Sequence, residues 1–179
     1  MKYIDEITKA MKILAENEKT IILGQSVKWK GTGLFWTLEG SFPMERRIEL
    51  PIFEDVQMGM CIGMALEGFI PVSMYPRLDF LILALNQMIN HLDKIEKMSD
   101  GQFKPKVIIR SAIGSVKPLF PGFQHNQDHS QAIKKMCTNI DVVVLKKPSQ
   151  IVKAYKKALV SERSTLLIEI PDLYLMEEE

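Results

Sequence analysis

The sequence predicts an α/β fold in which a mostly parallel sheet carries helices on both faces. Short apolar runs of strand length alternate along the chain with segments of helical periodicity. Most of these runs are continuously apolar, which is typical of strands that are covered on two sides. The chain has 179 residues, of which 46% are apolar and 25% charged, so we expect a single domain over residues 1–179 with a substantial core.

The N-terminal part is predicted to contain a helix and a strand. Apolar residues spaced by three and four indicate the helix, namely Ile4, Ile7, Met11 and Leu14. The run 20–23 is then predicted to be a buried strand that ends at Gly24. Residues 25–48 follow as a long irregular stretch, and a connection of this length is usually functional or ordered by a partner.

A helix, a strand and a longer helix come next. Residues 54–66 are predicted to be helical, with Gly68 as the stop, and residues 70–75 to form a strand. Residues 81–98 carry one apolar stripe, which predicts a long amphipathic helix.

The C-terminal part continues the alternation. The predicted elements are strand 107–109, a loop rich in Gly and Pro over 111–127, a helix opened by a capping box of Asp128 and Gln131, strand 141–145, a helix capped by Ser149 that runs to about Val160, and strand 166–170. In open α/β sheets, ligands bind beyond the carboxyl ends of the strands. Both long loops leave from such ends, after Leu23 and after Ile109, so we expect them to flank a site.

Composition and charge exclude several classes of protein. The formal net charge is +1, which favours neither nucleic acid nor an anionic membrane as a partner. No apolar run reaches the length of a transmembrane helix, and the acidic N-terminus lacks a signal core. The two cysteines, Cys61 and Cys137, are too few for a disulfide framework, and we expect reduced thiols in a cytoplasmic protein.

The segment Pro51–Gly59 holds the candidate catalytic group. It places Glu54 where an extended segment turns into a helix, and Phe80 follows after one helix and one strand. A lone acid beside an aromatic platform suits the holding and protonation of the aminopyrimidine ring of thiamine diphosphate. On local pattern alone, Glu54 could be a residue that complements the helix dipole and Phe80 a core residue.

Other polar clusters leave alternatives open. His125 and His129 are four residues apart, but no third ligand is evident nearby, so a metal site is not favoured over a substrate or partner contact. The cluster 28–30 mixes lysine with tryptophan, which fits a loop that docks on a partner better than a nucleic-acid contact. A phosphate-binding loop of the Gly-x-x-x-x-Gly-Lys type is absent from the sequence.

Several short motifs occur in an order and spacing that together resemble one family. They are Leu23-Gly24, Gly33-Leu34-Phe35 through Glu39-Gly40, Pro51-Ile52-x-Glu54, Gly59 with Gly63, Gly68-x-x-Pro71, Asp79-Phe80, Met98-Ser99-x-Gly101, Arg110 with Gly114, and Gln124-His125-x-Gln127. Over about residues 20 to 172 the chain resembles the pyrimidine-binding domain of transketolase-like thiamine diphosphate enzymes. The likeness is greatest to the beta subunit of the decarboxylating component of 2-oxo acid dehydrogenases.

The resemblance implies a role for each matching residue. Glu54 matches the acid that hydrogen-bonds a ring nitrogen of the aminopyrimidine and acts as a general acid/base through the cofactor. Phe80 matches the aromatic that stacks on this ring, and Ile52 matches an apolar contact of it. His125 matches a histidine that faces the substrate or its acyl intermediate. Gln25 stands where the beta subunits usually place an acid, and an amide can bind the cofactor but cannot relay a proton.

The resemblance also implies a divided enzyme. The Mg²⁺ that bridges the cofactor's phosphates is held in the family by a Gly-Asp-Gly segment and a later Asn on another domain, and Ser99-Asp100-Gly101 does not match that pattern. We therefore expect a separate diphosphate-binding partner subunit in an α2β2 assembly, with 2-oxo acid or ketose substrates. The C-terminal domain of the family beta subunits is not expected here, because the chain stops at Glu179.

Three alternatives accompany this interpretation. The chain could be a transketolase-type small subunit that acts on sugar phosphates. It could also be a non-catalytic regulatory or scaffold module of the same fold, which Gln25 favours and Glu54 with Phe80 disfavours. An unrelated nucleotide-binding α/β protein is disfavoured by the absent phosphate loop.

Overall fold

The computed structural model describes residues 1–116 and 120–178. Its regular elements are α1 (Tyr3–Glu16), β1 (Thr20–Gly24), α2 (Gly33–Trp36), β2 (Arg47–Glu49), α3 (Glu54–Leu66), β3 (Ile70–Met74), α4 (Leu78–Leu81), α5 (Ile95–Met98), β4 (Ile108–Ala112), α6 (Ser130–Met136), β5 (Ile140–Val144), α7 (Pro148–Val160) and β6 (Ser164–Glu169). Between α4 and α5 lie a 3₁₀ turn at Ile82–Ala84 and a π-helix at Asn86–Leu92, and further 3₁₀ turns occupy Met44–Arg46, Phe123–His125 and Pro171–Leu173.

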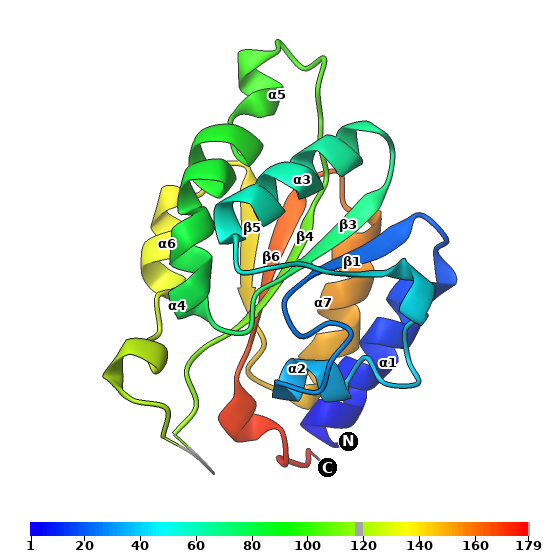
Figure 1. Ribbon diagram of the computed structural model, residues 1–179, viewed down its shortest axis with the longest axis vertical. Coiled ribbons are helices and arrows are strands. Elements are labelled where there is room, and N and C mark those ends of the chain that lie inside the picture. The colour runs from blue at the N-terminus through cyan, green and yellow to red at the C-terminus, as the bar shows by residue number, and fades with distance from the viewer. Residues whose placement is uncertain (117–119, 179) are drawn as a thin grey trace.

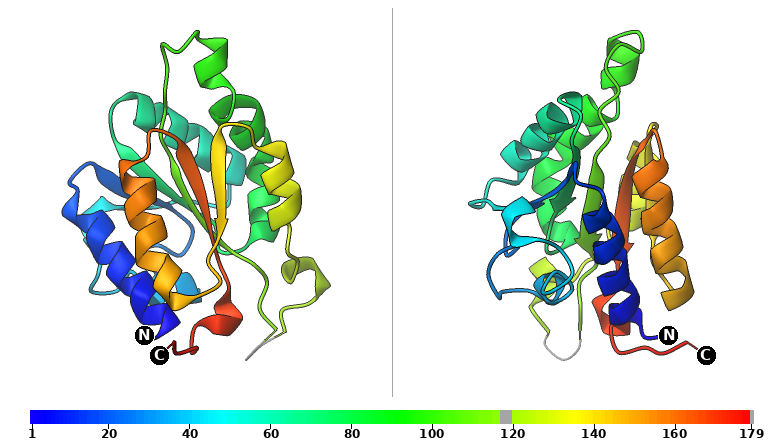
Figure 2. Two further views of the ribbon diagram at one scale, coloured as in Figure 1. Left: turned by 180° about the vertical axis from the view of Figure 1, so that it is seen from behind. Right: turned by 90° about the vertical axis from the view of Figure 1, so that its right-hand side faces the viewer.

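The sheet has six strands in the order β2-β1-β3-β4-β6-β5, and every neighbouring pair is parallel. Helices cover both of its faces (Figures 1 and 2). α1 and α7 lie on one face, and α3, the helical run from α4 to α5, and α6 lie on the other. The α/β fold predicted from the sequence is confirmed.

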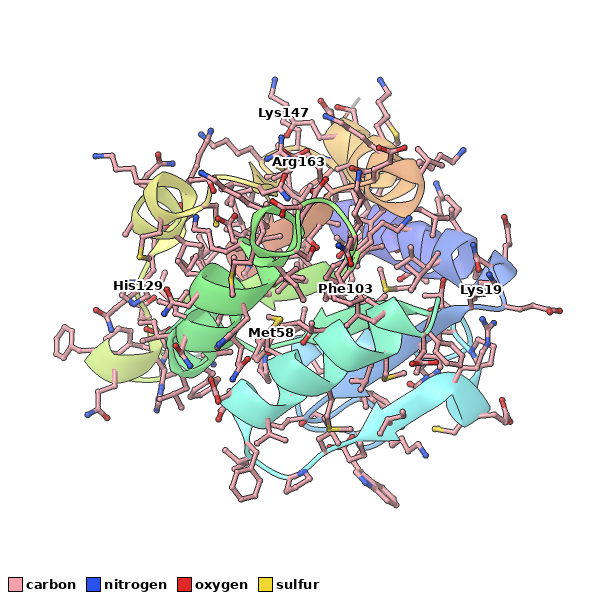
Figure 3. All side chains as sticks on the ribbon, turned by 90° about the horizontal axis from the view of Figure 1, so that it is seen from above. Lys19, Met58, Phe103, His129, Lys147 and Arg163 are labelled. Carbon is pink, nitrogen blue, oxygen red and sulfur yellow. The ribbon has the colours of Figure 1, made fainter. Side chains whose placement is uncertain are left out.

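The continuous apolar strands fill two cores at once. Consecutive residues of one strand point to opposite faces, so Ile22 packs under α1 and α7 while Leu23 packs under α3. Ile108 and Ile109 divide in the same way on β4. Met58 reaches from α3 into the second core (Figure 3). This two-sided burial is the reason why the strands lack polar alternation.

Predicted starts and ends agree with the structure in several places and fail in others. The helix over 54–66 has the predicted bounds, and Gly68 follows it with a φ of 86°. The capping box of Asp128 and Gln131 was wrong: α6 begins at Ser130, whose backbone N–H donates to the Asp128 carboxylate at 2.9 Å. The cap by Ser149 was also wrong, because α7 already begins at Pro148.

The long helix predicted over 81–98 is interrupted rather than continuous. Its apolar stripe is buried or partly buried as expected, but the backbone passes through 3₁₀ and π turns. Asp93 explains the path at the C-terminal end of the run. Its N–H donates to Met88 five residues back, and its carboxylate accepts the N–H groups of Thr138 and Asn139 at 2.9 and 2.7 Å. Tertiary bonds of this kind leave no trace in apolar spacing.

The two long predicted loops contain short ordered pieces. Residues 25–48 hold α2, a 3₁₀ turn and the first part of β2, and the last of these pairs with β1 at the edge of the sheet. The loop predicted over 111–127 begins after β4, and its residues 117–119 lie outside the described part, as does Glu179. None of the helices in the described ranges has both the length and the apolar character that a bilayer-spanning helix requires.

The two ends of the described chain meet. The N–H of Tyr3 donates to the carbonyl of Met176 at 2.9 Å, and Lys2 and Glu177 form an isolated antiparallel bridge. Both termini lie at the end of the sheet from which the long loops emerge (Figure 1).

Candidate functional site

The predicted site residues follow three strands whose carboxyl ends are level. Gly24 at the end of β1 pairs with Glu49 of β2 on one side and with Met74 of β3 on the other. Gln25 comes directly after Gly24, while Glu54 and Phe80 lie on the segments that leave β2 and β3. A Cβ at Gly24 would lie 2.3 Å from the carbonyl oxygen of Met74, so only glycine lets the strands approach this closely here.

Glu54 is the first residue of α3 and is 5% exposed. Among the described residues, none donates a hydrogen bond to its carboxylate. The free N–H groups and the dipole at the start of the helix favour a negative charge there. The carboxylate of this nearly buried residue is therefore not occupied by any donor of the described chain.

Two side chains that the sequence did not single out fix the position of Glu54. The hydroxyl of Tyr75 donates to the backbone carbonyl of Glu54 at 3.2 Å. The buried amide of Gln57 donates to the carbonyl of Met74 and to the hydroxyl of Ser73, both at 3.1 Å. The first turn of α3 is thereby bound to the end of β3. A polar Gln57 on the buried face of an otherwise apolar helix was the signal that could have found it.

Phe80 and His125 are brought together from different parts of the chain. Their ring centroids are 5.3 Å apart with an interplanar angle of 50°. Arg77 holds the backbone of this loop, since its guanidinium donates to the carbonyl of His125 at 2.9 Å. The Nδ1 atom of His125 is buried and has no hydrogen-bond partner among the described residues. The structure thus places the ring of Phe80 beside a histidine whose Nδ1 atom is buried and unpaired within the described residues.

Asp79, the neighbour of Phe80, holds the same loop from the other side. The amide of Gln127 donates to its carboxylate at 3.1 Å, and Nε2 of His129 lies 3.5 Å from the same oxygen. His129 lies beside the helical run that starts at α4 (Figure 3). In the described ranges no group of three His, Cys, Asp or Glu side chains is arranged to hold a metal ion. The imidazole of His125 contacts Phe80, and the imidazole of His129 lies beside Asp79, so the two histidines do not form a common site.

Ile52 lies on the surface next to Glu54. It is 75% exposed, and the following Phe53 is 61% exposed. Val56 and Met60 of α3 are also exposed, at 55% and 39%. These four exposed apolar side chains are named here the α3 apolar surface, and they lie close to Glu54 in the sequence. Exposed apolar groups that gather in this way usually mark a contact surface.

Gln25 is half-buried and begins a tight turn that is bound to Glu49. The backbone N–H groups of Ser26, Val27 and Lys28 donate to the Glu49 carboxylate at 2.6, 2.7 and 2.8 Å. Consecutive N–H groups that converge in this way form a nest, which in other proteins holds a phosphate or another anion. Here a side chain of the same chain already fills the nest.

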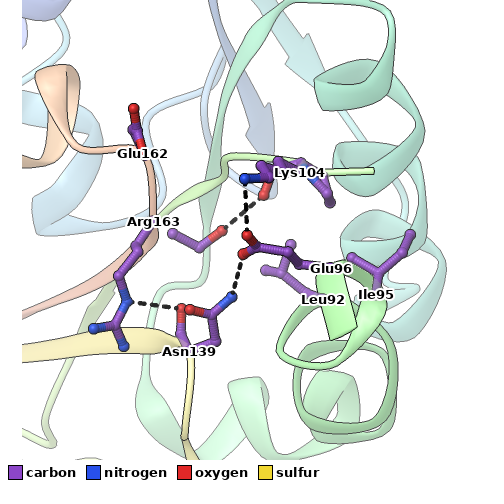
Figure 4. A pocket seen from close by; sticks show the side chains of 9 residues that line it. Leu92, Ile95, Glu96, Lys104, Asn139, Glu162 and Arg163 are labelled. Atoms are coloured by element: carbon purple, nitrogen blue, oxygen red, sulfur yellow. Dashed lines mark hydrogen bonds and ion pairs between the residues drawn. The ribbon is translucent and has the colours of Figure 1, made fainter. Parts of the chain in front are cut away.

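A small polar hollow lies at the other end of the sheet, where β5 and β6 begin (Figure 4). Glu96 in this hollow accepts from the amide of Asn139 at 3.0 Å and pairs with Lys104 at 3.2 Å. Arg163 donates to the carbonyl of Asn139 at 3.3 Å. These groups satisfy one another, so the hollow offers little to a ligand.

Comparison with known proteins supports a relationship to one group of enzymes. A scan of protein-family models finds none that matches. In sequence, the chain is 29% identical over 176 residues to the 2-oxoisovalerate dehydrogenase subunit beta of Bacillus subtilis, which covers 94% of this chain and 52% of that protein. It is 32% identical over 134 residues to the chloroplastic pyruvate dehydrogenase E1 component subunit beta-2 of Arabidopsis thaliana, covering 75% of this chain and 32% of that protein.

Solved structures agree on the fold. A structure described as a split gene transketolase, inactive beta4 tetramer, matches with a TM-score of 0.71 and 21% identity over 94% of this chain and 51% of the other. The transketolase of Campylobacter jejuni matches with a TM-score of 0.72 and 15% identity over 99% of this chain and 27% of that one. The chain thus has a transketolase-like fold and spans about half the length, or less, of these relatives. The resemblance predicted from the sequence is confirmed.

Proposed function

We propose, from this relationship to dehydrogenase beta subunits, that the chain is the aminopyrimidine-binding half of a split thiamine diphosphate-dependent enzyme. In this proposal the chain is active only with a partner subunit, and the assembly decarboxylates a 2-oxo acid or transfers a ketol group. The single observation that carries the proposal is the carboxylate of Glu54, which is nearly buried and lacks a donor among the described residues.

The residues present fit the ring of the cofactor. Glu54 would hold a proton at a ring nitrogen of the aminopyrimidine, and this bond would supply the partner that its carboxylate lacks. Phe80 would lie against the face of the ring, and Ile52 and Gln25 would contact its edge. His125, whose Nδ1 is unpaired in the described chain, would face the substrate. When bound, thiamine diphosphate supplies a nucleophilic carbon that attacks the substrate carbonyl.

The diphosphate and its Mg²⁺ would be held by the partner subunit. The nest formed by residues 26–28 is occupied by Glu49 and is not available to a phosphate. The α3 apolar surface lies next to Glu54 and would be covered by the partner, as the cores of subunit interfaces are. This arrangement fits an α2β2 assembly with sites between subunits.

A transketolase-type small subunit is the second candidate. The fold likeness to a split-gene transketolase favours it, although that likeness concerns the fold alone. The two candidates differ in substrate, so turnover of 2-oxo acids against ketose phosphates by the assembled enzyme separates them.

The decisive experiment replaces Glu54 in the assembled enzyme. Combined with a diphosphate-binding chain, thiamine diphosphate and Mg²⁺, the Glu54→Gln variant should lose on the order of 100-fold or more in turnover, because general acid/base catalysis contributes at least that much. The control is Glu67→Gln, which removes an exposed acid just after the same helix and should leave turnover unchanged. The isolated Glu54→Gln chain should unfold at a temperature close to that of the wild type, because no hydrogen bond to the carboxylate within the described chain is lost.

Two results would contradict the proposal. Calorimetric titration of thiamine diphosphate and Mg²⁺ into the isolated chain should show little heat, and tight binding without a partner would refute the divided site. Full turnover by an assembled Glu54→Gln variant would show instead that the chain is a scaffold.

A further inference from the structure

We propose that Glu49 is a positioning residue, which fixes Gln25 at the cofactor ring by holding the turn that follows it. The inference rests on the proposed function. It concerns a residue that belongs to none of the motifs that carry the family resemblance.

The contacts of Glu49 are strong for a single side chain. One carboxylate oxygen accepts from Val27 and Lys28, and the other accepts from Ser26, all within 2.8 Å. Hydrogen bonds to an ionised acceptor are shorter and about twice as strong as neutral ones. Three N–H dipoles that converge on one point repel each other unless an anion lies between them. The turn therefore depends on the charge of Glu49 and not only on its volume.

The turn that Glu49 holds is conformationally costly. Ser26 has a φ of 56°, in the left-handed region that side chains other than glycine rarely adopt. Gly31 leaves room for the Ser26 side chain, since a Cβ at residue 31 would lie 2.8 Å from the hydroxyl of Ser26. Such a backbone persists only when its surroundings determine it. Loss of the carboxylate should release Ser26 to an ordinary conformation.

Release of Ser26 would free the peptide unit that it shares with Gln25, so the backbone of Gln25 would no longer be held from that side. The other side of Gln25 is fixed, since Gly24 is locked between β2 and β3 and its carbonyl accepts from the N–H of Leu50 at 2.9 Å. Glu49 and Leu50 also begin the segment that leads to Glu54. Glu49 thus sets the relative placement of Gln25 and Glu54 at adjacent strand ends.

The test compares Glu49→Gln with Glu45→Gln, a control that removes an exposed acid four residues earlier. In the isolated chain, Glu49→Gln should speed hydrogen exchange at the amides of residues 26–28 by about tenfold or more, and the control should not. In the assembled enzyme, Glu49→Gln should raise the apparent KM for thiamine diphosphate by about tenfold, with kcat at saturation within about threefold of wild type.

A double-mutant cycle separates positioning from general stabilisation. If Glu49 acts through Gln25, Glu49→Gln should raise the KM no further in a Gln25→Ala background. Additive effects of the two changes, or amides at 26–28 that exchange at the wild-type rate, would overturn the inference. An assembled wild type that takes up no thiamine diphosphate would instead refute the proposed function, while the exchange measurement would still decide whether Glu49 holds the turn.

Discussion

At the scale of single residues, Arg110 and Glu169 form a buried ion pair in the centre of the sheet. Both side chains are fully buried, and Nε of Arg110 lies 2.5 Å from Oε1 of Glu169. Arg110 also donates to the hydroxyl of Thr37 at 2.8 Å, while the hydroxyls of Tyr155 and Tyr174 donate to Glu169 at 3.2 and 2.7 Å. Burial and the charge of Glu169 raise the pKa of both tyrosines well above the ordinary value, which keeps them neutral donors.

Removal of one partner from this pair should be severe. Glu169→Gln leaves the charge of Arg110 buried without compensation, which costs about 3–5 kcal/mol in the free energy of unfolding. Urea unfolding measures the loss. Arg163→Met is the comparison, because Arg163 and Asp141 are 45% and 31% exposed and such pairs contribute at most about 1 kcal/mol. Equal losses from the two changes would mean that the buried network is not what stabilises the centre of the sheet.

This pair was not predicted from the sequence. A charged residue that ends each of two apolar runs, at Arg110 and Glu169, indicates a buried partner but not which one. Glu54 could be predicted because it belongs to a short motif that is continuous in the sequence. Glu49 could not, because its three bonds join segments that are more than twenty residues apart, at separations of 21 to 23.

At the scale of elements, the loop between β4 and α6 depends on close contact between its two arms. A Cβ at Gly114 would lie 2.1 Å from the Cα of Asn126, next to His125, and backbone cannot move aside as a side chain can. Gly114→Ala should therefore push the arms apart and break the contact of His125 with Phe80.

The expected result is a local change. Hydrogen exchange at residues 120–129 should accelerate, and the ring-current shift on His125 should fall in NMR spectra, while the thermal midpoint of the chain moves by only a few degrees. Gly63→Ala is the matched control, because its Cβ would meet nothing within 4 Å and should leave the loop unchanged. An unaltered His125 signal in Gly114→Ala would show that the loop tolerates wider spacing.

Elements were predictable to the extent that apolar spacing defines them. The helix at 54–66 and the buried strands follow from local pattern. The three-residue β2 did not, because it is too short to show a pattern and exists by pairing with β1. The interruption at the C-terminal end of the predicted helix 81–98 was missed for a related reason, since the N–H groups of Thr138 and Asn139 donate to Asp93 and direct its path.

At the scale of the whole molecule, burial in the core between the sheet and α3 makes the stability depend on alkaline pH. Cys61 packs in the core between the sheet and α3, and burial raises the pKa of its thiol from 9.0 to about 12. Because the folded pKa is raised, the stability that this thiol contributes is complete below about pH 9 and is lost as the pH rises toward 12.

Urea unfolding across pH 7 to 10.5 should show this loss. The free energy of unfolding should fall above about pH 9, and it should fall less steeply in Cys61→Ala, by up to about 1.4 kcal/mol per pH unit. Burial also raises the pKa of Tyr75, so part of the alkaline slope remains in that variant. Parallel curves for wild type and Cys61→Ala would contradict this, because they would mean that the thiol has the same pKa in the folded and the unfolded chain.

The meeting of the two ends, through Lys2 and Glu177, has a consequence for how this fold is carried in longer proteins. A polypeptide that enters and leaves at one point can be interrupted by such a unit without being stretched, and the unit needs no spacer to fit. The same geometry should allow the two ends to be joined and the chain to be reopened in a surface turn without loss of the sheet.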